Sequence, residues 1–311
     1  MDPADAVVAS EPATTRLDRG ILAAVRIAAG LLWLANLEWK RPPDFGRDLG
    51  NGLYKYIDSA IRNPVFDPWS WFVEHVVVEQ YVLFGWFTLL SEAAVAALLI
   101  LGFKTRWAAV AGALLTVPIF LSVLYYDKQY EWPWSYYLMA ALHLAVFASA
   151  AGRFFGLDGV LRRGPASSAR AATVLGAVAA VTGAVGLWVA RSVDVFGHQG
   201  AMVGWADGEL KLLWFNPFSA AVTLALGLVA LGGVRFGRQL LVLGAAGGFA
   251  VLAVLVPVLW RYQQGDWTGG FLGATGPNLA FWGMLALGLL LTGRRIRPRA
   301  EPVVTEPTTA A

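Results

Sequence analysis

Eight apolar runs of about membrane length constrain the fold of this chain more than any other feature. Each is close to the ~20 residues that a helix needs to cross ~30 Å of hydrocarbon. Only 14% of the 311 residues are charged, whereas a soluble domain has about 25%. We therefore predict an all-α polytopic membrane protein with about eight transmembrane helices. The runs lie at residues 20–37, 80–102, 107–126, 134–151, 171–190, 217–233, 239–260 and 277–292.

The distribution of basic residues predicts the orientation of these helices. With both termini inside, the inner segments hold 14 of the 24 lysines and arginines, mostly in short stretches. The outer loops hold nine, together with 13 acids. Because basic residues favour the cytoplasmic side, we expect an integral plasma membrane protein of a bacterium with a cytoplasmic N-terminus and C-terminus. The net charge of +3 then follows from topology, so we expect the lipid membrane as a partner and no nucleic acid.

The longest inner connection, residues 152–170, divides the helices into two sets of four. Residues 1–19 are rich in Ala, Pro and Thr and carry four acids, which is typical of disorder. The domains that we expect are a disordered cytoplasmic tail at 1–19, a four-helix membrane domain at 20–163 with an outer loop at 38–79, a linker at 164–170, a second four-helix membrane domain at 171–293, and a basic then disordered cytoplasmic tail at 294–311.

The second domain contains no ionisable residue within its predicted helices. It carries small residues at helical spacing instead, at Gly176, Ala180 and Ala184 and at Gly244 and Gly248. Such spacing lets helix backbones approach closely. We interpret this domain as a scaffold or a partner surface.

Three ionisable residues of the first domain lie within predicted helices. Arg26, His143 and Glu92 are six, eight and ten residues from the inner ends of their helices, or roughly 9, 12 and 15 Å at 1.5 Å per residue. Because such groups are expensive in hydrocarbon, they mark functional sites by default. We predict a catalytic cluster of the three. In the alternative interpretation, Arg26 and Glu92 neutralise each other as a buried pair and His143 bonds to a neighbour.

The outer loop at 38–79 contains two stretches with helical spacing of apolar residues, at about 52–62 and 69–79. We predict amphipathic helices near the outer surface of the membrane. His75 and Glu79 are four residues apart and could share a helix face, but two candidate ligands make a weak metal signal. We predict no metal site.

Several short motifs follow one another in the first half of the chain. They are Val25-Arg26-Ile27-Ala28-Ala29-Gly30, Leu90-Ser91-Glu92, Leu101-Gly102-Phe103-Lys104-Thr105-Arg106 and Ala151-Gly152-Arg153-Phe154-Phe155-Gly156-Leu157-Asp158. Their order resembles the DoxX/DoxD family of four-helix membrane proteins, which includes the small subunit of thiosulfate:quinone oxidoreductase. The resemblance covers about residues 16–163. The exit from the first helix, Asn36-Leu37-Glu38-Trp39-Lys40, differs from the shorter Gly-x-x-Lys form that is common in the family.

The resemblance implies a membrane subunit of a redox or sulfur-metabolism system that works with quinone in some members. For cofactor binding we name Arg26, Trp33 and Arg153. The absence of cysteine excludes iron–sulfur clusters held by cysteine and attached c-type haem, and no haem or flavin motif is recognisable. Electrons would therefore pass between bound substrates or come from soluble or membrane redox partners. Two alternatives remain open, namely a non-catalytic scaffold that recruits redox enzymes, and a small-solute or lipid transporter.

Overall fold

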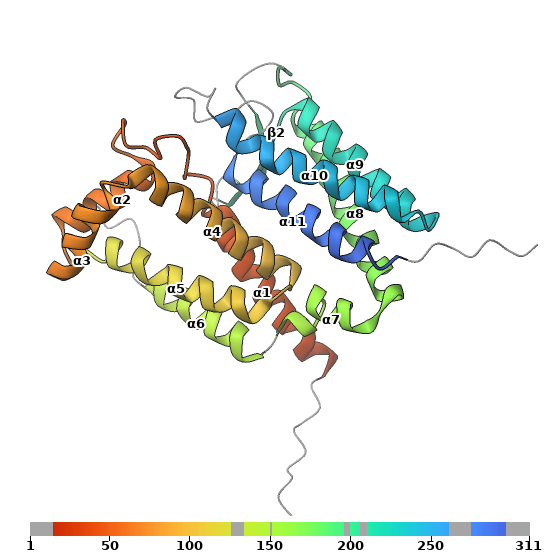
Figure 1. The fold of residues 1–311 in the computed structure, drawn as a ribbon, viewed down its shortest axis with the longest axis horizontal. Coiled ribbons are helices and arrows are strands. Elements are labelled where there is room, and N and C mark those ends of the chain that lie inside the picture. The colour runs from red at the N-terminus through yellow and green to blue at the C-terminus, as the bar shows by residue number, and fades with distance from the viewer. Residues whose placement is uncertain are drawn as a thin grey trace, which may run out of the picture.

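The computed structural model describes residues 15–125, 134–149, 151–195, 200–205, 210–260 and 275–296. Helices dominate this part of the chain (Figure 1). The long helices are α1 (Arg16–Ala35), α4 (Tyr81–Leu101), α5 (Thr105–Val123), α6 (Trp134–Ser149), α8 (Pro165–Val189), α9 (Pro217–Arg235), α10 (Gln239–Trp260) and α11 (Gly276–Gly293). The shorter elements are α2 (Gly52–Arg62), α3 (Asp67–Phe72), the π-helix η2 (Val73–Val77), the 3₁₀ turn η3 (Ala151–Arg153), α7 (Leu157–Arg163) and the strands β1 (Ala201–Trp205) and β2 (Leu210–Phe215).

Helices α1, α4, α5 and α6 form the first bundle, in which α1 packs on α4 and α5 packs on α6. We call the end where α1 stops and α4 begins the loop end, because residues 36–80 lie there. We call the opposite end, where α4 passes into α5, the turn end. Helix α2 and the continuous α3–η2 segment lie across the loop end (Figure 1).

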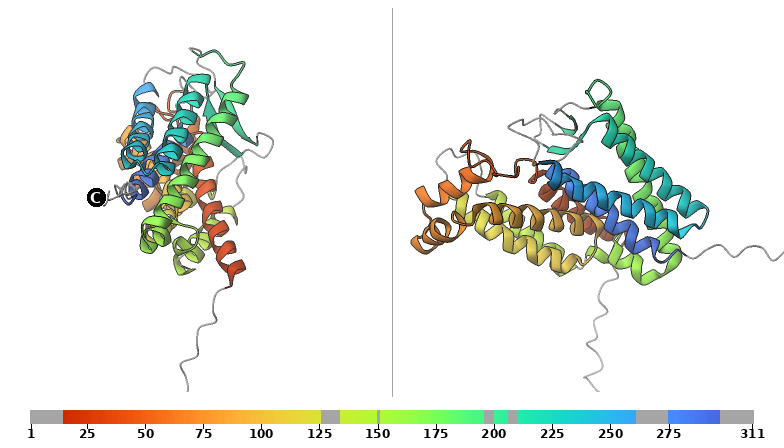
Figure 2. Two further views of the ribbon diagram at one scale, coloured as in Figure 1. Left: turned by 90° about the vertical axis from the view of Figure 1, so that its right-hand side faces the viewer. Right: turned by 45° about the horizontal axis from the view of Figure 1, so that its top comes forward.

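The second helical set is α8–α11, with α8 packed on α9 and α10 packed on α11. Helix α11 also contacts α4 and α1, which joins the two sets along their length. The antiparallel hairpin β1–β2 connects α8 to α9 on the side of the loop end (Figure 2). Asn278, at the start of α11, holds this hairpin through two hydrogen bonds of 2.9 Å with the backbone of Trp214.

All eight predicted runs contain a long helix, and six of these helices are long and apolar enough to span a membrane. The chain is therefore an integral membrane protein. Helix α1 carries Arg16, Asp18, Arg19 and Arg26, and α6 has 16 residues, so neither is among the six. The full set of eight spans and the cytoplasmic placement of the termini stay predictions.

Two parts of the sequence interpretation differ from the structure. The all-α prediction contained no strand, because the hairpin is short and its register shifts at Val203 and Gly204, which weakens the strand pattern. Helix α8 begins at Pro165, so the segment expected as a linker at 164–170 forms its first turns. Proline suits the first turn of a helix because it has no N–H to leave unpaired. The tails at 1–14 and 297–311 lie outside the described residues.

Small residues bring α8 and α9 together, as predicted for Gly176 and Ala180. A Cβ on Gly176 would lie 3.2 Å from the carbonyl oxygen of Gly227, and a Cβ on Gly227 would overlap the backbone of Ala180. Ala184 was predicted as the third small residue of α8 in this contact, but it is exposed. Gly183 contacts α9 instead. The prediction was also wrong for Gly244, which has no neighbour within 4 Å, whereas Gly248 packs on Leu226.

Candidate functional site

A cavity of about 490 Å³ lies inside the first bundle at the loop end. This volume falls within the range of small-molecule sites. Helices α1, α4, α5 and α6 supply its walls, and α2 and α3–η2 cover it. Most of the lining side chains are aliphatic or aromatic. The polar lining side chains include Asn36, Lys40, Trp69 and Glu92.

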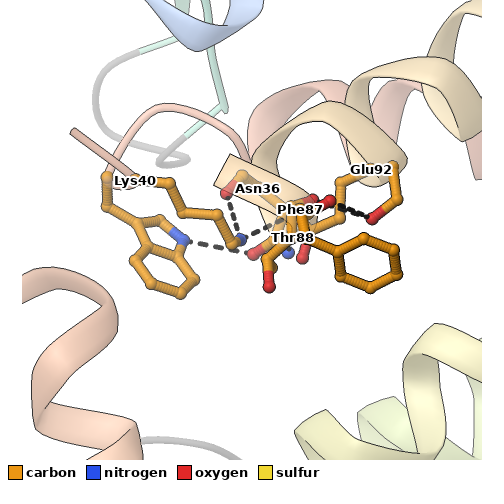
Figure 3. A network of polar contacts seen from close by, with 7 residues as sticks. Asn36, Lys40, Phe87, Thr88 and Glu92 are labelled. Atoms are coloured by element: carbon orange, nitrogen blue, oxygen red, sulfur yellow. Dashed lines mark hydrogen bonds and ion pairs between the residues drawn. The ribbon is translucent and has the colours of Figure 1, made fainter. Parts of the chain in front are cut away.

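A buried ion pair forms part of the cavity wall (Figure 3). Lys40 Nζ lies 2.7 Å from Glu92 Oε2, and the two side chains are 1% and 0% exposed. Asn36 Nδ2 donates to the same oxygen at 3.2 Å. The ammonium group also donates to the carbonyl oxygen of Asn36 at 2.9 Å and lies 3.7 Å from the ring centroid of Trp39. The charge of Glu92 therefore has a counterion, two donors and an enclosed environment.

The segment after α1 places Lys40 beside Glu92. Helix α1 ends at Ala35, and residues 36–40 form turns from which Asn36 and Lys40 contact Glu92 of α4. Phe45 then anchors this segment, because its buried ring lies against Gly85 of α4, where a Cβ would overlap it. The Tyr81 hydroxyl donates to the Phe45 carbonyl at 2.8 Å. A small residue in α4 and a buried aromatic residue in the loop thus fix the position of Lys40 along the bundle axis.

Helix α2 and η2 cover the cavity because each has an apolar stripe. Leu53, Ile57 and Ala60 recur at helical spacing in α2, and all three are buried. Val73 and Val77, one turn apart in η2, are buried as well. Helices were predicted at about 52–62 and 69–79, and the structure has them at Gly52–Arg62 and, as α3 and η2, at residues 67–77.

Two buried side-chain polar atoms of the cavity-lining residues have no hydrogen-bond partner among the described residues. They are the indole nitrogen Nε1 of Trp69 and the carboxylate oxygen Oε1 of Glu92. A buried polar group without a partner costs about 1–3 kcal/mol. One of these atoms is a donor and the other is an acceptor, so a ligand with both functions would satisfy them.

Arg26 does not lie beside Glu92, which corrects the predicted cluster. Its guanidinium group donates to the carbonyl oxygens of Ala151, Phe154 and Phe155, each at 3.2 Å. It occupies the turn end next to Gly102, ten residues from Glu92 along α4, or about 15 Å. Helical side chains tilt toward the N-terminus, and a long arginine extends its charge away from the hydrocarbon.

The buried pair that the sequence suggested between Arg26 and Glu92 is therefore a pair between Lys40 and Glu92. Among the described residues, no hydrogen bond or ion pair joins Arg26, Glu92 and His143 to one another. Arg153, the predicted cofactor-binding residue at the turn end, has an exposed side chain and does not line the cavity.

His143 is held between two neighbours on the side of the cavity nearer the turn end. Its Nε2 accepts from the Trp33 indole N–H at 2.9 Å, and its Nδ1 lies 2.7 Å from the Met139 carbonyl oxygen. A neutral imidazole with the proton on Nδ1 satisfies both contacts. Trp33 and His143 do not line the cavity themselves. Their hydrogen bond joins α1 to α6 about one turn nearer the turn end than the lining residues Asn36 and Met139.

The Trp33–His143 contact depends on a glycine in α5. A Cβ on Gly112 would overlap His143 Nε2. We expect Gly112→Ala to destabilise the protein by about 1–3 kcal/mol, because the ring must move away from Trp33. Gly244→Ala is the matched control: the site is helical with nothing within 4 Å, and alanine favours helix by up to about 1 kcal/mol. Thermal unfolding in detergent measures both, and equal shifts of the midpoint would contradict the prediction.

Four residues of the site were missed in the sequence. Asn36, Trp39 and Lys40 were assigned to the exit of the first helix, and Trp69 to an amphipathic surface helix. A usable signal existed, because a carboxylate within a membrane span requires a partner and Lys40 lies five residues after the end of α1.

His75, considered above as a metal ligand, stacks on Trp71 with the ring centroids 5.0 Å apart. The described residues contain no group of three potential metal ligands.

Together, the helices and the site define an integral membrane protein with a buried ion pair at an internal cavity. Residues 19–178 match the family model described as TQO small subunit DoxD, where TQO denotes thiosulfate:quinone oxidoreductase. The match covers more than half of the chain, so the chain belongs to the DoxD family, as its motifs indicated. It extends from α1 into α8 and includes the whole cavity. Comparisons with curated proteins and with solved structures found no match.

Proposed function

We propose that this protein is the membrane subunit of a quinone-linked oxidoreductase and that its cavity binds the quinone. The family description supports the class of enzyme. The observation that carries the proposal is that two residues lining the cavity each have a buried polar atom without a partner, Trp69 Nε1 and Glu92 Oε1. A quinone oxygen accepts the indole proton, and the hydroxyl of the reduced form donates to the carboxylate. The apolar lining suits the ring and its tail.

In this proposal the ion pair takes part in proton transfer to the quinone. When bound, a quinone accepts two electrons and two protons. Lys40 and Glu92 lie 2.7 Å apart, so a proton can pass between them within one hydrogen bond. Asn36 fixes Glu92 Oε2 and leaves Oε1 for the ligand. In this proposal Glu92 keeps its predicted role in proton transfer, whereas Arg26 and His143 hold the helices at positions that do not line the cavity.

The electrons come from a partner in this proposal. The chain has no cysteine, so it cannot hold a cluster through thiolates. Two thiosulfate ions that join as tetrathionate release two electrons, which balance the two taken by the quinone. We assign that oxidation to a partner subunit, and the description of the family as a small subunit supports this division.

We further propose that the protein lies in a bacterial plasma membrane with the turn end in the cytoplasm. Many basic residues surround that end, and basic residues favour the cytoplasmic side. They include Arg16, Arg19, Lys104, Arg106, Arg153, Arg162 and Arg163. The scaffold alternative has less support, because recruitment of partners requires neither a cavity nor a buried ion pair.

Trp69→Phe tests the proposed contact with the quinone. The ring remains but the donor is lost, and a neutral hydrogen bond contributes about 0.5–1.5 kcal/mol. We expect the affinity for decyl ubiquinone to fall by about 2–12-fold. The matched control is Trp71→Phe, in the same helix, because Trp71 is 59% exposed and does not line the cavity. Calorimetric titration of the purified protein gives both affinities. No binding to the wild-type protein, or equal losses in the two variants, would contradict the proposal.

A further inference from the structure

Helix α2 and η2 cover the cavity toward the loop end. Leu53 and Ile57 of α2 and Val73 and Val77 of η2 line it from that side. Their exposed fractions are between 0% and 6%, so the covering helices leave little surface of these residues accessible from outside. A ligand entering through the loop end would have to displace this packed layer.

Some residues of the cavity wall are also exposed on the sides of the bundle. Three lining residues are more than half exposed, namely Leu32 of α1 at 51%, Phe87 of α4 at 62% and Leu138 of α6 at 69%. All three are apolar and belong to the long helices of the bundle. Leu138 lies four residues into α6, about 6 Å from its start. We call Leu32 and Leu138, on the neighbouring helices α1 and α6, the side opening.

The hydrogen bond between Trp33 and His143 joins α1 and α6 beside the side opening, at 2.9 Å. Trp33 follows Leu32 directly, and His143 lies five residues beyond Leu138 toward the turn end. No described residue before Leu32 in α1, and none after Leu142 in α6, lines the cavity. The side opening therefore lies in the last turns of the bundle, toward the loop end.

The covering segment itself carries an exposed apolar face. Phe66, Trp71, Phe72 and Val76 are 41–59% exposed along α3 and η2. Exposed aromatic residues on a helix at the end of a membrane bundle are typical of the interface between headgroups and hydrocarbon. We therefore place α3 at this interface. The side opening lies one to two turns nearer the turn end, so it faces hydrocarbon.

From these observations we infer that the ligand enters the cavity sideways from the bilayer, through the side opening, and leaves its tail there. This inference rests on the proposed function and defines the substrate class further: a membrane-dissolved quinone with a long apolar tail. The ring lies deep in the cavity near Trp69 and Glu92, and the tail passes Leu138 into the lipid. A water-soluble substrate has no use for an opening of this kind.

Because the chain contains no cysteine, a single introduced thiol can be labelled without background. Leu138→Cys is placed in proteoliposomes and labelled with a small fluorescent maleimide. Leu144→Cys is the matched control, since Leu144 is 64% exposed on the same helix and does not line the cavity. Two readouts are used: quenching of the label by spin-labelled lipids, and slowing of the labelling by decyl ubiquinone or by the ubiquinone headgroup without a tail.

We expect lipid quenching at both positions. Decyl ubiquinone at ten times its Kd should slow labelling about tenfold at Leu138→Cys and leave Leu144→Cys unchanged, and the tail-less headgroup should slow neither. Reaction of Leu138→Cys without lipid quenching would overturn the inference, and so would equal protection by the tail-less headgroup. If the wild-type protein binds neither compound in calorimetry, the proposed function fails, and lipid quenching still reports whether the opening faces the bilayer.

Discussion

Lys40→Met is expected to destabilise the protein by about 3–5 kcal/mol, because it leaves the carboxylate of Glu92 buried without its counterion. The Glu92 side chain is 0% exposed, and Lys40 lies 2.7 Å away. After the substitution, Asn36 remains as the donor to Oε2, and one neutral amide does not replace an ammonium group. Reversible unfolding in mixed detergent micelles measures the loss.

The double variant Lys40→Met/Glu92→Met distinguishes the cost of an unpaired buried charge from the net contribution of the ion pair to the free energy of unfolding. Replacing both partners by apolar residues is often neutral or stabilising, so we expect its stability within about 1 kcal/mol of the wild-type protein. Arg62→Met is the control: its pair with Asp58 lies on the surface, with Arg62 73% exposed, and such pairs contribute about 0–1 kcal/mol. A double variant as unstable as Lys40→Met would contradict this account.

The double variant also distinguishes structure from function. If the pair serves only to hold α4 to the segment after α1, the folded double variant should still bind decyl ubiquinone as the wild-type protein does. In our account it loses the carboxylate that meets the reduced ligand, so its affinity for the reduced form should fall more than its affinity for the oxidised form. Equal affinities of the two proteins for both forms would assign the pair a structural role alone.

Leu115→Trp is expected to lower the affinity for decyl ubiquinone by about 100-fold, because the added ring occupies the space of the ligand. Leu115 lies on α5 and lines the cavity of about 490 Å³. The cost of making room for extra atoms in a packed site is about 1–3 kcal/mol, and the upper part of this range corresponds to about 100-fold in affinity.

The neighbouring residue supplies the control for this substitution. Leu114 is 66% exposed on the other face of α5 and does not line the cavity. Leu114→Trp adds the same atoms outside the cavity, so the affinity should stay within twofold of the wild-type value, or about 0.4 kcal/mol. Calorimetric titration gives both affinities. Similar losses in the two variants would place the ligand elsewhere.

The sequence predicted the helices well because long apolar runs have few alternatives in a membrane. It also identified Glu92 correctly as an unusual group, since a carboxylate within a span is rare. The three-residue cluster was wrong in geometry, because depth was counted from the backbone. The side chain of Arg26 reaches the turn end, and a count of residues does not contain that direction.

The counterion of Glu92 was missed for a related reason. Lys40 lies beyond the end of α1, so it was counted among the charges of the outer loop. Its burial results from contacts between residues distant in sequence, above all Phe45 against Gly85, and no local pattern reports them. The cavity is likewise a product of how α2 and η2 fold back over the bundle.

The most direct test of the central claim is an experimental structure of the protein with decyl ubiquinone bound. We expect the ring inside the cavity, with one oxygen within hydrogen-bond distance of Trp69 Nε1, the other facing Glu92, and the tail passing Leu138. A ring bound at Arg26 and the turn end, or on the outer surface of α8–α11 with the cavity empty, would contradict the account.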